Sequence, residues 1–192
     1  MDIRADSIKP WLDICTSVLT IVGAFVAAAW GLNEYFNKRK EGRIKATLEY
    51  RQELNKDPVL SAQRKIDDIL TSQKNLILET ISNKSEDDWT KLVYSIVESN
   101  NLQQPLDTLV NFYEDVYLCI SNSICDEQTA IALFGNKVIA FRNQFYRYFI
   151  FTRAEMKDPG YASGLEALAK LAKLSRAAPN SLSRNSREAR AP

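Results

Sequence analysis

The side chains that could support catalysis are few. The chain of 192 residues contains no histidine, so neither a Ser–His nor a Cys–His pair can form. Its six glycines build no phosphate-binding loop, and no spacing of residues is typical of metal ligands. We therefore expect a protein that is not an enzyme and that carries no cofactor and no metal.

Neighbouring carboxylates are the remaining candidates for acid–base chemistry. They occur at Asp67-Asp68, Asp87-Asp88 and Glu114-Asp115. Adjacent residues of a helix point about 100° apart, so the two members of such a pair cannot easily share one substrate. We interpret the first two pairs as exposed acidic helix surface.

Glu114 is the carboxylate of most interest, because it follows Tyr113 in a segment rich in aromatic residues. A partly buried carboxylate needs a cation or hydrogen bonds, and Arg142 and Arg147 further along the chain could supply a cation. Two interpretations stay open. The four residues form either a polar tie between two helices or the pocket of a ligand-binding sensor.

Aromatic and basic residues also alternate in the run FRNQFYRYFIFTR, a composition that occurs at nucleic-acid interfaces. Most of these aromatic residues fall on the spacing of a buried helix face, which leaves few of them free to stack on bases. We do not expect nucleic acid to be a partner.

The elements that must position these side chains are helices. Apolar residues recur at three- and four-residue steps, and no alternation typical of a strand is present. The pattern predicts an all-α domain of about five helices over residues 57–175, followed by a disordered tail over 176–192. Predicted helices cover 58–81, 86–97, 105–120, 127–152 and 165–174, with Asp57 and Asp126 as N-caps, Pro58 as the first helical residue, and Leu76 and Leu174 on buried faces.

The segment 14–32 has a different composition, since it holds nineteen residues without a charge. As a helix it would be about 28 Å long, close to the thickness of the hydrocarbon core of a bilayer. Trp11 and Trp30 lie near its ends, where aromatic rings prefer the lipid headgroups. We interpret it as a transmembrane helix. The alternatives are a buried core helix and a signal peptide cleaved near Ala27.

Charge asymmetry predicts the orientation of this span. Lys38, Arg39 and Lys40 follow it, whereas residues 1–13 carry more acidic than basic side chains. Basic residues stay on the cytoplasmic side, so we expect residues 1–13 outside the inner membrane, a basic helical stalk over 33–56, and a cytoplasmic domain. In the reducing cytoplasm all three cysteines should be free, and a Cys119–Cys125 disulfide becomes plausible only in the reverse orientation.

Small residues at Gly23, Ala27 and Gly31 are spaced by four and could let two membrane helices approach closely. The first functional hypothesis is a single-pass membrane protein whose helical domain binds a partner protein or a second copy of the chain. The alternative is a membrane-disrupting effector of a bacterial anti-phage defence module, in which clustered spans open a leak.

A resemblance to a known family rests mainly on the run LVNFYEDVYLCISNSICDEQTAIALFGNKVIAFRNQF. The apolar segment and the basic stalk precede this run, and an LxxLAK segment follows it. Residues 10–172 resemble a bacterial family of membrane-anchored helical proteins that is described only as a domain of unknown function. The resemblance implies an all-helical cytoplasmic domain and no established activity.

Overall fold

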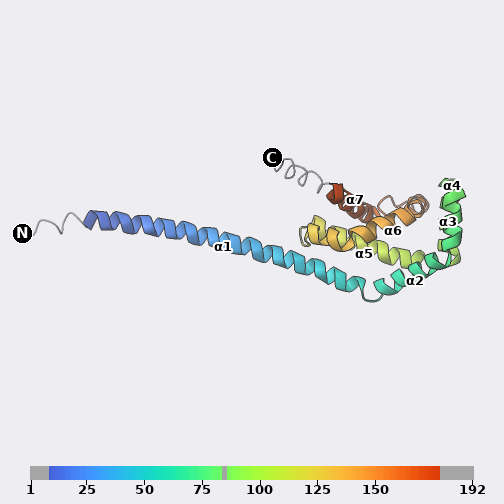
Figure 1. The fold of residues 1–192 in the computed structure, drawn as a ribbon, viewed down its shortest axis with the longest axis horizontal. Coiled ribbons are helices and arrows are strands. Elements are labelled where there is room, and N and C mark those ends of the chain that lie inside the picture. The colour runs from blue at the N-terminus through green and yellow to red at the C-terminus, as the bar shows by residue number, and fades with distance from the viewer. Residues whose placement is uncertain (1–8, 84–85, 178–192) are drawn as a thin grey trace, which may run out of the picture. The chain divides into compact units, whose positions relative to one another are not determined.

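The computed structural model describes the backbone of residues 9–83 and 86–177, and the side chains of residues 27–80 and 87–177. In these ranges the chain forms seven α-helices and no strand (Figure 1). The predicted all-α class is confirmed. The helices are α1 (Lys9–Leu54), α2 (Val59–Ser72), α3 (Lys74–Asn83), α4 (Glu86–Ser99), α5 (Gln103–Ser121), α6 (Glu127–Met156) and α7 (Ser163–Ala177). The tail predicted to be disordered lies outside the described residues from 178 onward.

Helix α1 is continuous from the apolar segment through the basic stalk. The chain divides into two compact units, residues 1–42 and residues 43–192, so that the last turns of α1 belong to the second unit. There Thr47 and Leu54 are buried, and the Tyr50 ring packs edge-on against Phe112 of α5, with 6.3 Å between the ring centroids. The C-terminal end of α1 is therefore part of the core of the second unit.

Within the described part of the chain, no helix has the length and apolar character needed to cross a membrane.

The predicted transmembrane segment falls largely on residues 14–26, whose side chains lie outside the described residues. The structure therefore gives the membrane span no support, and the span stays a prediction.

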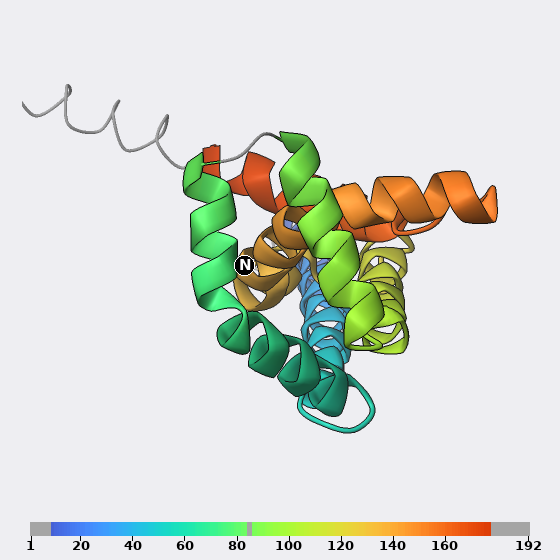
Figure 2. The ribbon, with the colours of Figure 1, turned by 90° about the vertical axis from the view of Figure 1, so that its right-hand side faces the viewer.

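The helix predicted over 58–81 is two helices, because the chain changes direction at Gln73 (Figure 2). Thr71 and Ser72 are weak helix formers, and the Ser72 hydroxyl donates to the Ile69 carbonyl at 2.8 Å, which competes with the helical hydrogen bonds. Six helices thus follow α1, one more than predicted. The bend also leaves Leu76, which we expected to be buried, 41% exposed.

The predicted N-cap at Asp57 is wrong. Pro58 occupies the N-cap position of α2, and no side chain caps the helix. The preceding turn closes through the backbone, since the Asn55 and Lys56 amides donate to the Gln52 and Glu53 carbonyls. The second predicted cap is confirmed, because the Asp126 carboxylate accepts a hydrogen bond of 2.9 Å from the Thr129 amide at the start of α6.

Helices α5, α6 and α7 hold most of the core. Their buried stripes follow the predicted spacing and meet around fully buried phenylalanines of α6, each of which contributes about 1.5–3 kcal/mol by leaving water. The largest fully buried side chains of the three helices are Leu106, Val110, Val116, Phe134, Val138, Phe145, Phe149, Leu165 and Leu168. At the end of α7, Leu174 departs from the prediction and is 57% exposed.

Two glycines let α7 approach its neighbours closely. A Cβ atom on Gly164 of α7 would lie 3.2 Å from the backbone Cα of Glu114 on α5. A Cβ atom on Gly135 of α6 would lie 3.2 Å from the Cβ of Ala172 on α7. Glycine at these positions sets the spacing of the three-helix core.

The turn between α5 and α6 contains a disulfide between Cys119 and Cys125, with Cα atoms 5.1 Å apart. The prediction of three free thiols is therefore wrong for this pair. The Ile124 and Cys125 amides both donate to the Cys119 carbonyl at 3.0 Å, so the turn folds back over the last turn of α5 and brings the two sulfur atoms together. Both cysteines are buried.

Candidate functional site

A cavity of about 610 Å³ lies between α4 and α6 and is the candidate site for a partner. We call it the α4–α6 groove. The contributing positions on α4 are spaced by three and four residues, and those on α6 lie within one turn, so each set occupies a single helix face. The lining residues are Thr90, Lys91, Tyr94, Ser95, Glu98, Ser99, Arg147, Tyr148 and Phe151.

Three aromatic rings form the apolar part of the groove. The Tyr94 ring meets the Phe151 ring edge-on with 4.8 Å between centroids, and its centroid lies 6.4 Å from that of Tyr148. Tyr148 is buried among the core side chains, whereas Phe151 is 43% exposed. The groove therefore has a fixed aromatic floor and an aromatic rim that water still reaches.

The groove also carries charges of both signs. The Tyr94 hydroxyl donates to the Glu98 carboxylate one helical turn away, and this hydrogen bond is the main cause that raises the pKa of Tyr94 to about 12. Tyr94 is therefore neutral at physiological pH. Lys91 and Arg147 add two cations to the lining, from α4 and α6 respectively.

This arrangement is suited to binding. Rings with an exposed edge beside cations and a carboxylate can take up an aromatic or aliphatic side chain together with its polar neighbours. Within the described ranges, no group of three or more His, Cys, Asp or Glu residues could hold a metal ion. The groove therefore offers aromatic, cationic and acidic contacts to a partner.

Tyr113 and Glu114 lie on α5 but face different surroundings. Tyr113 is buried against Phe112 and Phe141, and desolvation raises the pKa of its hydroxyl. The Glu114 carboxylate accepts a hydrogen bond of 3.3 Å from the Gly164 amide at the start of α7. Partial burial raises the pKa of Glu114, and the backbone amides of Gly164 and Ser163 oppose that effect. Glu114 thus ties α5 to α7.

The two arginines that we considered as partners of Glu114 line other cavities of α6. The Arg142 guanidinium lies over the Tyr146 ring, 4.0 Å from its centroid, beside a hollow between α6 and α7. Arg147 lines the α4–α6 groove. Tyr113, Glu114, Arg142 and Arg147 therefore do not share one pocket.

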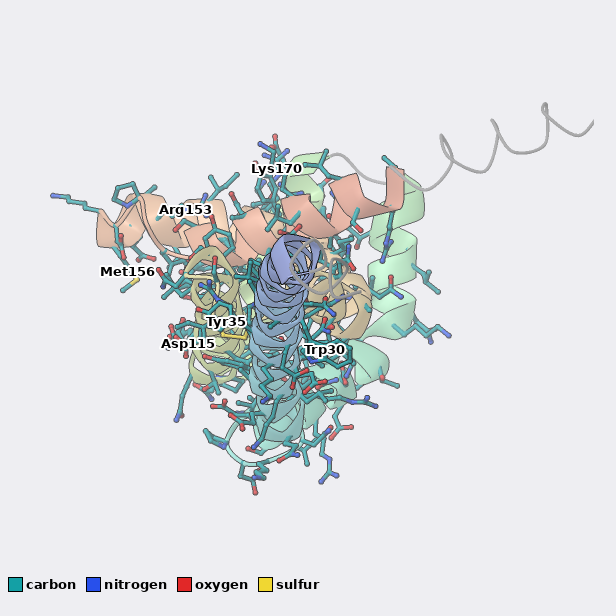
Figure 3. The ribbon with its side chains drawn as sticks, turned by 90° about the vertical axis from the view of Figure 1, so that its left-hand side faces the viewer. Trp30, Tyr35, Asp115, Arg153, Met156 and Lys170 are labelled. Atoms are coloured by element: carbon teal, nitrogen blue, oxygen red, sulfur yellow. A yellow bond between two sulfur atoms is a disulfide. The ribbon has the colours of Figure 1, made fainter. Side chains whose placement is uncertain are left out.

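A second polar junction joins α5, α6 and α7 and was not predicted. The Tyr161 hydroxyl donates to the Asp107 carboxylate at 2.7 Å. Arg153 donates from Nε to the Tyr161 carbonyl at 2.7 Å, and its Nη2 lies 3.2 Å from the Glu166 carboxylate. Figure 3 shows Arg153 beside α7. Because these residues lie far apart in the sequence, periodicity alone gave no signal for the junction.

The residues predicted to contact the membrane lie on α1. Trp30 is 75% exposed, and the basic residues Lys38, Arg39 and Lys40 are exposed as well. Lys38 pairs with Glu34 one turn earlier at 3.2 Å. Trp11 lies outside the residues whose side chains are described.

The predicted association ridge also lies on α1. Ala27 and Gly31 are exposed, and a Cβ atom on Gly31 would meet nothing within 4 Å. Gly23 falls outside the described side chains.

Residues 18–172 match the model of a domain of unknown function, DUF4760. The chain belongs to the DUF4760 family. The matched residues include the α4–α6 groove and the Cys119–Cys125 turn. They also include the Glu114–Gly164 hydrogen bond and the Arg153–Glu166 ion pair, so all of these features lie within the family domain. No curated protein and no solved structure matches the chain. Membership in DUF4760 assigns no activity, and the functional argument rests on the residues themselves.

Proposed function

We propose that this protein is a single-pass membrane protein of the inner membrane that binds a protein partner through the α4–α6 groove and catalyses no reaction. The observation that carries the proposal is the aromatic lining of the groove, with Tyr94, Tyr148 and Phe151 beside Lys91 and Arg147. Aromatic residues and arginine are the types most enriched among the energetically dominant residues of protein interfaces.

The sequence of α1 supports the membrane part of the proposal. Residues 14–32 are free of charge, and the basic cluster Lys38–Lys40 begins after residues 33–37. Trp30 near the end of the uncharged stretch, and Tyr35 and Phe36 before the basic cluster, are exposed aromatic residues. Aromatic residues between an apolar helix and a basic cluster are typical of the lipid headgroup layer.

Two features bear on which side of the membrane the helical domain lies, and they favour opposite sides. The basic cluster favours a cytoplasmic domain, whereas the Cys119–Cys125 disulfide favours an oxidising compartment. We propose the cytoplasmic orientation, because the charge rule acts on the segment next to the span during insertion.

Photo-crosslinking from the groove tests the binding function. We would place a photoreactive phenylalanine analogue at Phe151, on the rim of the groove, in the full chain in its own membrane. We expect a protein adduct of one defined mass; an adduct of twice the chain's mass identifies a second copy as the partner. The same analogue at Thr108 of α5, a partly exposed position outside the groove, is the positional control and should give no such adduct.

Substitution of Tyr94 makes this test specific. Tyr94→Phe keeps the ring contact with Phe151 and removes only the hydrogen bond to Glu98, so the adduct should persist. Tyr94→Ala removes the ring and should reduce the adduct about tenfold, as expected for loss of an interface aromatic residue. Equal yields from positions 151 and 108, or equal yields with Ala and Phe at position 94, would contradict binding through the groove.

The ridge on α1 favours a second function, in which spans associate and permeabilise the membrane. Ala27 and Gly31 present small, exposed surfaces spaced by one turn. Substituting Gly23 and Gly31 by leucine should abolish growth inhibition on overexpression. If the unmodified protein does not impair growth, with or without phage, this second function is excluded.

A further inference from the structure

The hollow between α6 and α7 is a separate cavity of about 420 Å³ on the second unit of the chain. Its lining includes Arg142 from α6 and Glu166, Lys170 and Lys173 from α7. Positions 166, 170 and 173 are spaced by four and three residues, so they follow one face of α7. Figure 3 shows Lys170 on the outward side of that helix.

The one carboxylate of the lining is already neutralised. Glu166 pairs with Arg153, and both side chains of this pair are largely buried. Among the described residues, Arg142, Lys170 and Lys173 make no ion pair, which leaves three cations of two helices around the hollow. Ser163 at the start of α7 also lines the hollow, whereas the Gly164 amide already donates to the Glu114 carboxylate.

Arg142 is held in a defined position. Its guanidinium lies over the Tyr146 ring at 4.0 Å, and Nη1 lies 3.4 Å from the Asn143 side-chain oxygen. Stacking of this kind fixes the plane of the guanidinium and leaves its edge available for in-plane hydrogen bonds. A planar edge of this kind matches two oxygens of a phosphate group, whereas lysine acts as a point charge.

We propose that the α6–α7 hollow binds a phosphate group, with Arg142 in bidentate contact and Lys170 and Lys173 as flanking charges. A phospholipid headgroup and a soluble phosphate ester share this chemistry. The site lies apart from the α4–α6 groove and does not depend on whether α1 spans a membrane.

Binding measurements on the full chain in a zwitterionic detergent test this proposal. The probes are inorganic phosphate, glycerol 3-phosphate and a short-chain phosphatidylglycerol used below its micelle concentration. We expect saturable binding that weakens with salt. Preference for the lipid identifies the headgroup as the source, and equal affinity for glycerol 3-phosphate identifies a soluble ester; either result supports the site.

Variants locate the site on the protein. Arg142→Gln should weaken binding about tenfold or more, as expected for loss of a charge-assisted hydrogen bond. Arg142→Lys keeps the charge and loses the bidentate geometry, so its affinity should fall between those of the Gln variant and the unmodified protein. Lys170→Gln and Lys173→Gln should each weaken binding severalfold.

Arg51→Gln and Lys56→Gln are the matched controls, since both side chains are exposed and lie outside this hollow. Each variant must keep the circular dichroism spectrum and the urea midpoint of the unmodified protein. Equal weakening by the control and hollow substitutions, or no saturable binding of any probe, would overturn the proposal.

Discussion

The Asp126 amide donates a hydrogen bond of 2.9 Å to the hydroxyl of Thr47, across 79 positions of the sequence. Thr47 is 0% exposed near the C-terminal end of α1, and Asp126 caps α6 directly after the disulfide-bonded turn. The contact fastens the last turns of α1 to the start of the longest helix of the second unit. Both residues belong to the second unit, so the contact holds the C-terminal end of α1 within the domain proposed to bind the partner.

Thr47→Val should test this connection. Valine keeps the shape of threonine and removes the acceptor of the Asp126 amide, which then remains without its partner in a part-buried position. We expect a loss of about 1–3 kcal/mol in the free energy of unfolding, measured by urea denaturation. Thr47→Ser keeps the hydroxyl and should cost less than Thr47→Val. If valine and serine had equal effects, the hydrogen bond would not matter to stability.

Gly164→Ala should destabilise the domain, although alanine is a better helix former than glycine. The added methyl group would lie 3.2 Å from the Cα and Cγ atoms of Glu114, and the helix backbone of α5 cannot move without disturbing the core. We expect a loss of about 1–3 kcal/mol in urea denaturation. Gly42→Ala, where the methyl group meets nothing within 4 Å, is the control and should cause no loss. A gain from Gly164→Ala would show that α5 and α7 are less closely packed.

Glu114→Gln should change how stability depends on pH. Burial raises the folded-state pKa of Glu114 above its unfolded value, so the folded state holds the proton more tightly. This contribution to stability is fully present below the unfolded pKa of about 4 and is lost as pH rises through the raised folded pKa. Glutamine can still accept the Gly164 hydrogen bond and does not ionise.

We therefore expect the urea midpoint of Glu114→Gln, compared with that of the unmodified protein, to shift upward as pH rises from about 4 to 7. If the difference between the two urea midpoints stayed constant over this range, or moved in the opposite direction, burial would not disfavour the ionised form of Glu114.

Reduction of the Cys119–Cys125 disulfide should destabilise the domain. The bond closes a short loop, with a sequence separation of six, and restricts the unfolded chain. Chain-entropy arguments give a contribution of about 2 kcal/mol for a loop of this size. The measurement is urea denaturation with and without a dithiol reductant, and Cys119→Ser with Cys125→Ser should reproduce the reduced state. If the reductant also destabilised the double serine variant, its effect would not come from this disulfide.

Local patterns in the sequence predicted the helical elements well. The stripe of α6, its Asp126 cap and the buried residues of α5 followed from spacing and cap chemistry alone. The break at Gln73 was missed, because the apolar period continues across it while Thr71 and Ser72 weaken the helix locally. Leu174 was placed on a buried face because periodicity reports the face of a helix and does not tell where the neighbouring helix ends.

The candidate site was less predictable, since it depends on contacts between distant residues. Sequence reasoning offered Arg142 and Arg147 as candidate partners of Glu114. The observed partner is the Gly164 amide, a backbone group that composition cannot reveal. The groove was missed because the FRNQFYRYFIFTR run was interpreted as core, while Phe151 stands at the rim beside Tyr94 of α4. The i, i+4 pair Tyr94 and Glu98 was the one local signal of that surface.

Membrane fractionation with protease protection tests the central claim most directly. The full chain would carry a tag at its C-terminus and be expressed in bacterial cells. We predict that it stays in the membrane pellet after high-salt and carbonate washing, with the tag protected until the inner membrane is opened. Recovery of the chain in the soluble fraction would contradict the membrane anchor, and digestion of the tag from outside intact spheroplasts would contradict the cytoplasmic orientation.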